Sequence, residues 1–144
     1  MPRQAWTCAC IWCGATWGNP RRRRLPGRKV LLTNAPAAYA ARVMGVLGIA
    51  DCFDAIFSIE DMHVFGQLRP KPDTRLFRRM AARLGVPPQR CILVEDTLGH
   101  QKAARSVGMG TVWMQRWLGD RTRARRRPAY VGRRVRHLRD LLRR

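Results

Sequence analysis

Short apolar runs alternate with amphipathic segments through the middle of the chain. The apolar runs predict four buried strands, at residues 29–33, 55–59, 91–94 and 111–114. The segments between them place apolar residues at helical spacing and predict three helices, at residues 36–47, 73–84 and 101–107. A further basic helix is expected at residues 134–142.

Helix boundaries are marked by residues that favour caps and breaks. Pro36 suits the first turn of a helix, and Asp73 can accept hydrogen bonds from the amides of a helix that follows it. Glycines stand where these helices would end, at positions 48, 85 and 108. The helix boundaries marked by these residues therefore agree with those predicted from the hydrophobic periodicity.

Strands that alternate with helices, each strand continuously apolar, favour an α/β fold whose parallel sheet is covered on both faces. Ligands in such sheets gather at the carboxyl ends of the strands. Two polar pairs fall at those ends, Thr33-Asn34 and Glu95-Asp96.

Length and composition limit the chain to one domain of ordinary hydrophobicity. The 144 residues are 46% hydrophobic, and no apolar stretch approaches the 18 residues that a membrane span needs. The start only weakly resembles a signal peptide, because it lacks a clear cleavage site. Cys8, Cys10 and Cys13 offer three thiolates, but a fourth metal ligand is missing. We therefore expect free thiols and a cytoplasmic protein rather than a zinc site.

Charge is concentrated at the two ends of the chain. The formal net charge is +20, from 29 basic and 9 acidic residues. Residues 21–24 are four arginines, and residues 116–144 hold twelve arginines against Asp120 and Asp140. We expect three parts: a poorly ordered basic lead-in (1–28), a core (29–118) and an arginine-rich tail (119–144). Basic ends suit nucleic acid, but we favour a solvated arginine-rich tail as their explanation.

Three polar features remain once the core is assigned: Thr33-Asn34, Lys71 within RPKP (69–72), and Glu95-Asp96. A hydroxyl and backbone amides can hold phosphate oxygens, and a lysine offsets developing negative charge. Carboxylates can hold Mg²⁺, which prefers oxygen ligands. Together, in this order, the three features point to one phosphate site, with Mg²⁺ and Lys71 both keeping the carboxylates ionised.

The segments LLTNAP, RPKPD and ILVEDT resemble the second, third and fourth motifs of the haloacid dehalogenase-like hydrolase superfamily. The sequence from Val30 to about Leu118 is most similar to the pyrimidine 5'-nucleotidase branch of this superfamily. The resemblance implies a three-layer, Rossmann-like α/β fold with a parallel sheet.

Roles for individual residues follow from the same resemblance. It implies that Thr33, Asn34 and Lys71 contact the substrate phosphate, with Lys71 also acting in catalysis. It implies Asp96 as a direct Mg²⁺ ligand and Glu95 as a ligand or an indirect partner. The implied substrate is a nucleoside monophosphate or another phosphate ester.

The family's first motif supplies the nucleophilic aspartate, and this chain has no counterpart. No Asp or Glu precedes Asp51, so there is no nucleophile and one Mg²⁺ ligand is missing. Only 32 residues precede Thr33, which leaves no room for the usual cap. Residues 7–12 can fill the central strand position, but they carry no acid. We therefore expect an N-terminally truncated core that binds Mg²⁺ weakly and is inactive as it stands.

Two other interpretations stay open at this point. The first is an arginine-rich nucleic-acid-binding protein without enzymatic activity, using the basic ends. The second is an open reading frame from a truncated gene with no selected function.

Overall fold

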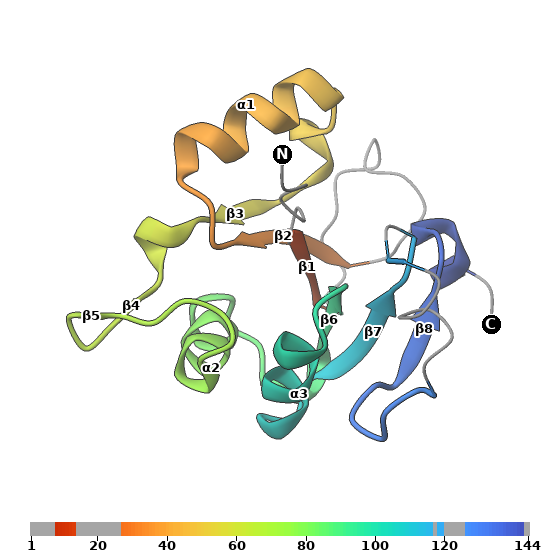
Figure 1. Ribbon diagram of the computed structural model, residues 1–144. Helices are drawn as coiled ribbons and strands as arrows, with labels where there is room; N and C mark the ends of the chain where they lie inside the picture. Colours follow the sequence, from red (N-terminus) through yellow and green to blue (C-terminus); the bar gives the residue numbers. More distant parts are fainter. Residues whose placement is uncertain (1–7, 14–26, 117, 120–125, 143–144) are drawn as a thin grey trace.

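The computed structural model describes residues 8–13, 27–116, 118–119 and 126–142. Its centre is a six-stranded sheet in the order β3-β2-β1-β6-β7-β8 (Figure 1). The strands are β1 (Cys8–Cys13), β2 (Arg28–Thr33), β3 (Ala55–Phe57), β6 (Cys91–Glu95), β7 (Gly110–Met114) and β8 (Arg133–Val135). A separate hairpin pairs β4 (His63–Val64) with β5 (Gln67–Leu68).

Helices lie on both sides of this sheet, so the fold has three layers (Figure 1). The helices are α1 (Ala37–Leu47), α2 (Thr74–Arg83) and α3 (Leu98–Ser106). In Figure 1, α1 lies above the sheet, and α2 and α3 lie side by side beneath it. Short 3₁₀ turns complete the connections: η1 (Ala50–Cys52), η2 (Ile59–Asp61), η3 (Pro88–Arg90) and η4 (Leu138–Leu142). The predicted α/β class is confirmed.

The main core forms between the sheet and α2. Leu76, Phe77 and Met80 of α2 are fully buried, and they cluster with Leu32 and Leu93 of the central strands. Burying each such side chain contributes about 1.5–3 kcal/mol. Asp73 begins this helix as predicted, because its carboxylate accepts a hydrogen bond from the Arg75 amide at 2.8 Å.

A second apolar cluster covers the opposite face of the sheet. Val94, Val112 and Val135 form it, with Leu141 of η4 packed against them. Since Leu93 and Val94 are neighbours on β6 but belong to different clusters, that strand is buried on both faces. This burial explains why its sequence is a continuous apolar run rather than an alternating one.

The central position of the sheet is held by β1, which lies in the segment expected to be a poorly ordered lead-in. At the other end of that segment β2 begins at Arg28, while residues 1–7 and 14–26 lie outside the described residues. β1 pairs with both β2 and β6, and both pairings are antiparallel, so the sheet is not wholly parallel. Cys8 lies opposite Thr33, and Cys10 lies opposite Val94. The strand thereby covers the edges of β2 and β6 that would otherwise be open.

The predicted helix at residues 134–142 is wrong. The segment instead begins with β8, which extends the sheet beside β7, and ends in the 3₁₀ turn η4. The Gln115 amide donates to the Val135 carbonyl at 2.8 Å, and Val135 is buried. Pairing with β7 therefore outweighs the local helical pattern, and the folded unit continues beyond residue 118. Among the described residues, no helix is long and apolar enough to cross a bilayer.

Candidate active site

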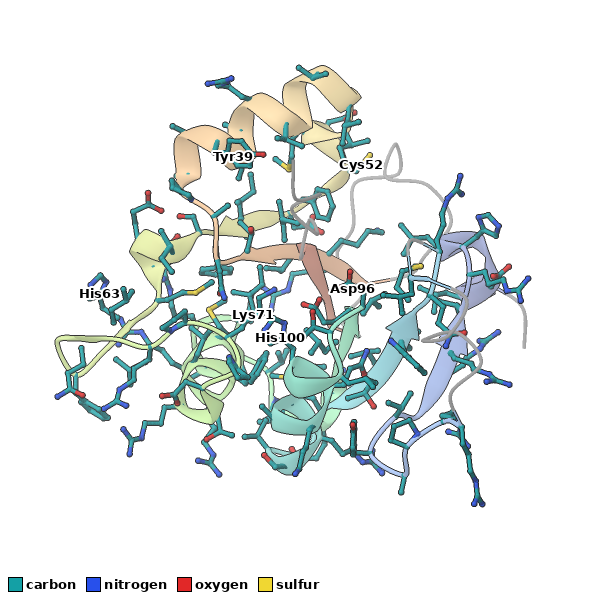
Figure 2. The ribbon with its side chains drawn as sticks, in the orientation of Figure 1. Tyr39, Cys52, His63, Lys71, Asp96 and His100 are labelled. Carbon is teal, nitrogen blue, oxygen red and sulfur yellow. The ribbon has the colours of Figure 1, made fainter. Side chains whose placement is uncertain are left out.

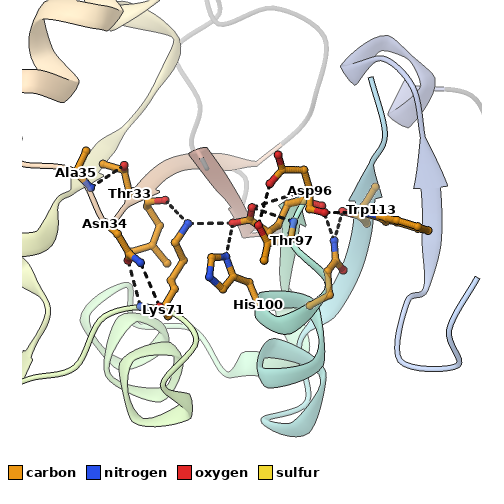
Figure 3. A network of polar contacts seen from close by, with 12 residues as sticks. Thr33, Asn34, Ala35, Lys71, Asp96, Thr97, His100 and Trp113 are labelled. Atoms are coloured by element: carbon orange, nitrogen blue, oxygen red, sulfur yellow. Dashed lines mark hydrogen bonds and ion pairs between the residues drawn. The ribbon is translucent and has the colours of Figure 1, made fainter. Parts of the chain in front are cut away.

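Lys71 joins the carboxyl ends of β2 and β6, which lie on either side of β1 (Figure 3). Its ammonium donates to the Leu32 carbonyl at 3.1 Å and to Glu95 Oε2 at 2.9 Å. Both charged side chains are completely buried. Thr33 and Asp96 directly follow Leu32 and Glu95 in sequence. The structure therefore brings them to one edge of the sheet together with Lys71.

Thr33 and Asn34 shape the turn that follows β2. Thr33 is buried, and its hydroxyl oxygen accepts a hydrogen bond from the Ala35 amide at 3.1 Å. The Asn34 side chain forms two hydrogen bonds of 3.1 Å with the backbone of Lys71, one donated and one accepted. Asn34 therefore fixes the Lys71 loop against β2, a task that its sequence position did not reveal. Its predicted contact with phosphate stays a prediction.

Glu95 lies at the centre of a buried polar network. Besides Lys71, His100 Nδ1 lies 3.1 Å from its Oε2, and the amides of Asp96 and Thr97 donate to its Oε1 at 3.1 and 3.3 Å. Burial alone would raise the pKa of Glu95, but contacts with His100, Asp96 and Lys71 outweigh it and hold the pKa far below its ordinary value. Both oxygens of Glu95 are therefore committed inside the protein. This arrangement favours an indirect role over direct metal ligation.

Asp96 differs from its neighbour in both exposure and protonation. Its side chain is only partly buried, and the Thr97 hydroxyl donates to its Oδ1 at 3.2 Å. Burial and the adjacent Glu95 carboxylate raise the pKa of Asp96 from 3.8 to about 6. The sequence predicted that Mg²⁺ and Lys71 together keep both carboxylates ionised. The structure supports this for Glu95, whereas the pKa of Asp96 moves in the opposite direction.

Three residues that sequence reasoning missed hold this edge in place. His100 contacts Glu95, as described above. Gln101 is fully buried and donates to the carbonyls of Glu95 and Val112 at 2.7 and 2.6 Å. The Trp113 indole donates to the Asp96 carbonyl at 2.9 Å. For Gln101 the sequence contained a clue: it is an amide on the inner side of a helix, and buried polar groups require partners.

Figure 2 shows Lys71, His100 and Asp96 grouped near the middle of the molecule, away from Tyr39 and Cys52. The acids nearest in sequence to the missing motif also lie elsewhere. Asp51 belongs to η1, and Asp54 accepts a hydrogen bond of 2.7 Å from the Lys29 amide at the amino end of β2. Both therefore lie toward the opposite edge of the sheet.

The donor set at this edge does not form a complete Mg²⁺ site. Asp96 offers one carboxylate, its carbonyl is engaged by Trp113, and Glu95 is fully occupied. Within the described ranges, no three His, Cys, Asp or Glu residues could together hold a metal ion. Cys8, Cys10 and Cys13 lie on β1, whose side chains are outside the described part of the structure.

Comparison with known proteins shows which family the chain resembles. A family model described as haloacid dehalogenase-like hydrolase matches residues 21–108, which is more than half of the chain. Fructose-1-phosphate phosphatase YqaB of Escherichia coli (strain K12) is 36% identical over 80 residues, covering 56% of this chain and 40% of the relative. Phosphoglycolate phosphatase of the same strain is 30% identical over 82 residues, covering 57% of this chain and 31% of the relative. The chain thus spans less than half the length of these relatives.

Solved structures agree at the level of the fold. A dehalogenase crystal structure superposes with a TM-score of 0.62 at 22% identity, covering 78% of this chain and 46% of the other. The putative hydrolase YfnB from Bacillus subtilis, solved with magnesium bound, gives a TM-score of 0.57 at 21% identity, covering 78% of this chain and 45% of the other. These relatives are phosphatases and hydrolases, including a dehalogenase, so they leave the pyrimidine 5'-nucleotidase type as a proposal.

Proposed function

This chain belongs to the haloacid dehalogenase-like hydrolase family, and we propose that its carboxyl-edge site binds the phosphoryl group of a small phosphate monoester. The buried pair of Lys71 and Glu95, 2.9 Å apart, carries the proposal, because it assembles the ends of β2 and β6 into one site. In this proposal the Thr33 hydroxyl and the Lys71 ammonium contact phosphate oxygens, and Asn34 keeps the Lys71 loop in place.

Binding without hydrolysis is the form of the function that we propose for this chain. Hydrolysis in this chemistry requires a carboxylate that attacks phosphorus and an acid that protonates the leaving group. No Asp or Glu occurs in residues 1–50, and the central strand β1 has the sequence CACIWC. Lys71 cannot replace an attacking carboxylate, because an ammonium that donates to Leu32 and Glu95 has no free electron pair with which to attack phosphorus.

Mg²⁺ binding is proposed to be weak and to depend on Asp96. One partly buried carboxylate beside a second negative charge attracts a divalent cation but does not enclose it. We expect a dissociation constant in the millimolar range, which corresponds to about −4 kcal/mol. Bound Mg²⁺ would supply charge neutralisation at the phosphate, and Asp96 is the residue that would hold it.

The ligand class is proposed from the relatives and from the resemblance of the motifs. The two phosphatase relatives are named for fructose 1-phosphate and phosphoglycolate, and the motifs resemble those of pyrimidine 5'-nucleotidases. These ligands share a dianionic phosphoryl group, which is the part that Thr33 and Lys71 would contact. Our finer proposal is a pyrimidine nucleoside monophosphate.

Thermal stabilisation by ligand provides the test. Uridine monophosphate, fructose 1-phosphate and phosphoglycolate are each titrated with Mg²⁺, and the gain in stability gives the affinity. The Thr33→Val variant, which keeps the shape and removes the hydroxyl, should bind at least ten times more weakly than wild type, whereas Thr33→Ser should bind normally. Equal binding by Thr33→Val and wild type would refute the site. Stabilisation by the other two ligands but not by the nucleotide would refute only the finer proposal.

A further inference from the structure

The outer side of α2 carries four exposed arginines, Arg75, Arg78, Arg79 and Arg83, which we call the arginine stripe. Their spacing of three or four residues places them on one side of the helix. The opposite side is formed by the buried residues of the main core, Leu76, Phe77, Met80 and Ala81. The stripe therefore faces away from the protein.

Little of the charge on this stripe is neutralised. Arg83 lies 3.4 Å from Asp61, and its guanidinium carbon is 4.7 Å from the centre of the Phe57 ring. Arg75, Arg78 and Arg79 form no ion pair with a carboxylate in the part of the chain that the structure describes. The adjacent α3 adds two exposed cations, Lys102 and Arg105. The helical layer thus presents concentrated positive charge, separate from the basic ends of the chain.

We propose that the arginine stripe binds the phosphate backbone of a double-stranded nucleic acid without reading its sequence. From Arg75 to Arg83 the helix rises about 12 Å. A duplex carries one phosphate of each strand for about every 3.4 Å of its axis, so about 12 Å of axis holds three to four phosphates of each strand. Guanidinium groups form paired hydrogen bonds with phosphate oxygens, which suits arginine rather than a general cation for this contact. The inference is independent of the proposed phosphate monoester site.

The chemistry of the stripe favours a duplex over two other polyanions. Proteins that hold single strands without sequence preference stack bases on aromatic side chains. Helices that lie on membranes bury large apolar residues beside their cations. The only exposed residue of α2 apart from the stripe is Ala82, which offers neither. A backbone contact made by charge alone therefore fits best.

Salt dependence of binding tests the proposal directly. Anisotropy of a labelled 20-base-pair duplex is measured with the full chain between 50 and 300 mM salt. Log affinity falls with log salt, and the variant Arg75→Gln/Arg78→Gln/Arg79→Gln should make this negative slope shallower by about 2.7. Each lost phosphate contact removes about 0.9 from its magnitude. Replacing the same three residues with lysine should preserve the slope.

The matched control removes equal charge from the C-terminal segment, at the exposed residues Arg126, Arg134 and Arg136. It should change the slope by less than one. Equal losses in the two glutamine variants would overturn the proposal in favour of general net charge. Tighter binding to a single strand of the same length, or to vesicles containing an anionic lipid, would overturn it as well. If the triple variant does not fold, the comparison of Arg79→Glu with Arg134→Glu gives the same test.

Discussion

Replacing Lys71 with methionine should destabilise the protein strongly. Methionine is one heavy atom shorter than lysine and equally unbranched, so the change removes the charge while leaving the cavity largely filled. The variant leaves Glu95 as a buried carboxylate without its cation and leaves the Leu32 carbonyl without the ammonium that now donates to it. Breaking a buried ion pair in this way costs about 3–5 kcal/mol. That is a large part of the roughly 5–15 kcal/mol that stabilises a typical domain.

Urea unfolding followed by far-ultraviolet circular dichroism measures this loss. We expect about 4 kcal/mol for Lys71→Met, and less than 0.5 kcal/mol for Lys102→Met, which alters an exposed lysine on α3. The double variant Lys71→Met/Glu95→Gln should recover at least half of the loss, because it removes the stranded charge. A loss below about 1 kcal/mol for Lys71→Met would refute the argument that this pair assembles the site.

The pH dependence of the same variant provides an internal check. In the native protein the pKa of Glu95 is held below its ordinary value of 4.5, so its stabilising contribution is present above that pH and fades as the pH falls through the folded pKa. Without Lys71 the folded pKa rises, and Glu95 can be neutralised at a higher pH. The deficit of Lys71→Met should therefore shrink from pH 8 toward pH 5.

Two further predictions concern Asp96 and its support. The folded pKa of Asp96 is about 6 against 3.8 when unperturbed, so its stabilising contribution is present below pH 3.8 and lost as the pH rises through 6. Asp96→Asn should consequently raise stability by about 1 kcal/mol at pH 7.5, after allowance for solvent screening, and thermal melts should show no gain below pH 4. Trp113→Phe removes the indole hydrogen bond to the Asp96 carbonyl and should cost about 1–2 kcal/mol in urea unfolding, with weaker Mg²⁺ binding by calorimetry. An unchanged Mg²⁺ affinity in Trp113→Phe would show that Asp96 does not need this support.

Much of the fold could be predicted because local pattern and tertiary packing agree. β2 and β6 are buried on both faces and therefore read as continuous apolar runs, and α2 shows its buried side at helical spacing. The remaining elements depend on partners distant in sequence. β1 takes its central place by pairing with both β2 and β6, and β8 forms by pairing with β7. The sequence placed residues 7–12 at the central position but predicted neither the antiparallel direction of β1 nor the formation of β8.

The same division applies to the candidate site. The order of motifs predicted that Lys71 would meet the acids after β6, and the contact of 2.9 Å with Glu95 bears this out. The sequence could not assign different roles to Glu95 and Asp96. The two residues are adjacent at the end of β6, and only the folded chain shows that their side chains have different surroundings. His100 was equally invisible, since its contact with Glu95 arises from the way α3 packs against β6.

Phosphate release by the purified chain tests the central claim most directly. The chain is incubated with uridine monophosphate, fructose 1-phosphate and phosphoglycolate in excess Mg²⁺, and released phosphate is followed by phosphorus NMR. We predict binding that broadens or shifts the ligand resonance in wild type and is at least ten times weaker in Thr33→Val, with no release above a blank lacking protein. Mg²⁺-dependent release by the unmodified chain that is abolished in Asp96→Asn would contradict the account and would require a nucleophile other than an aspartate or glutamate before residue 51.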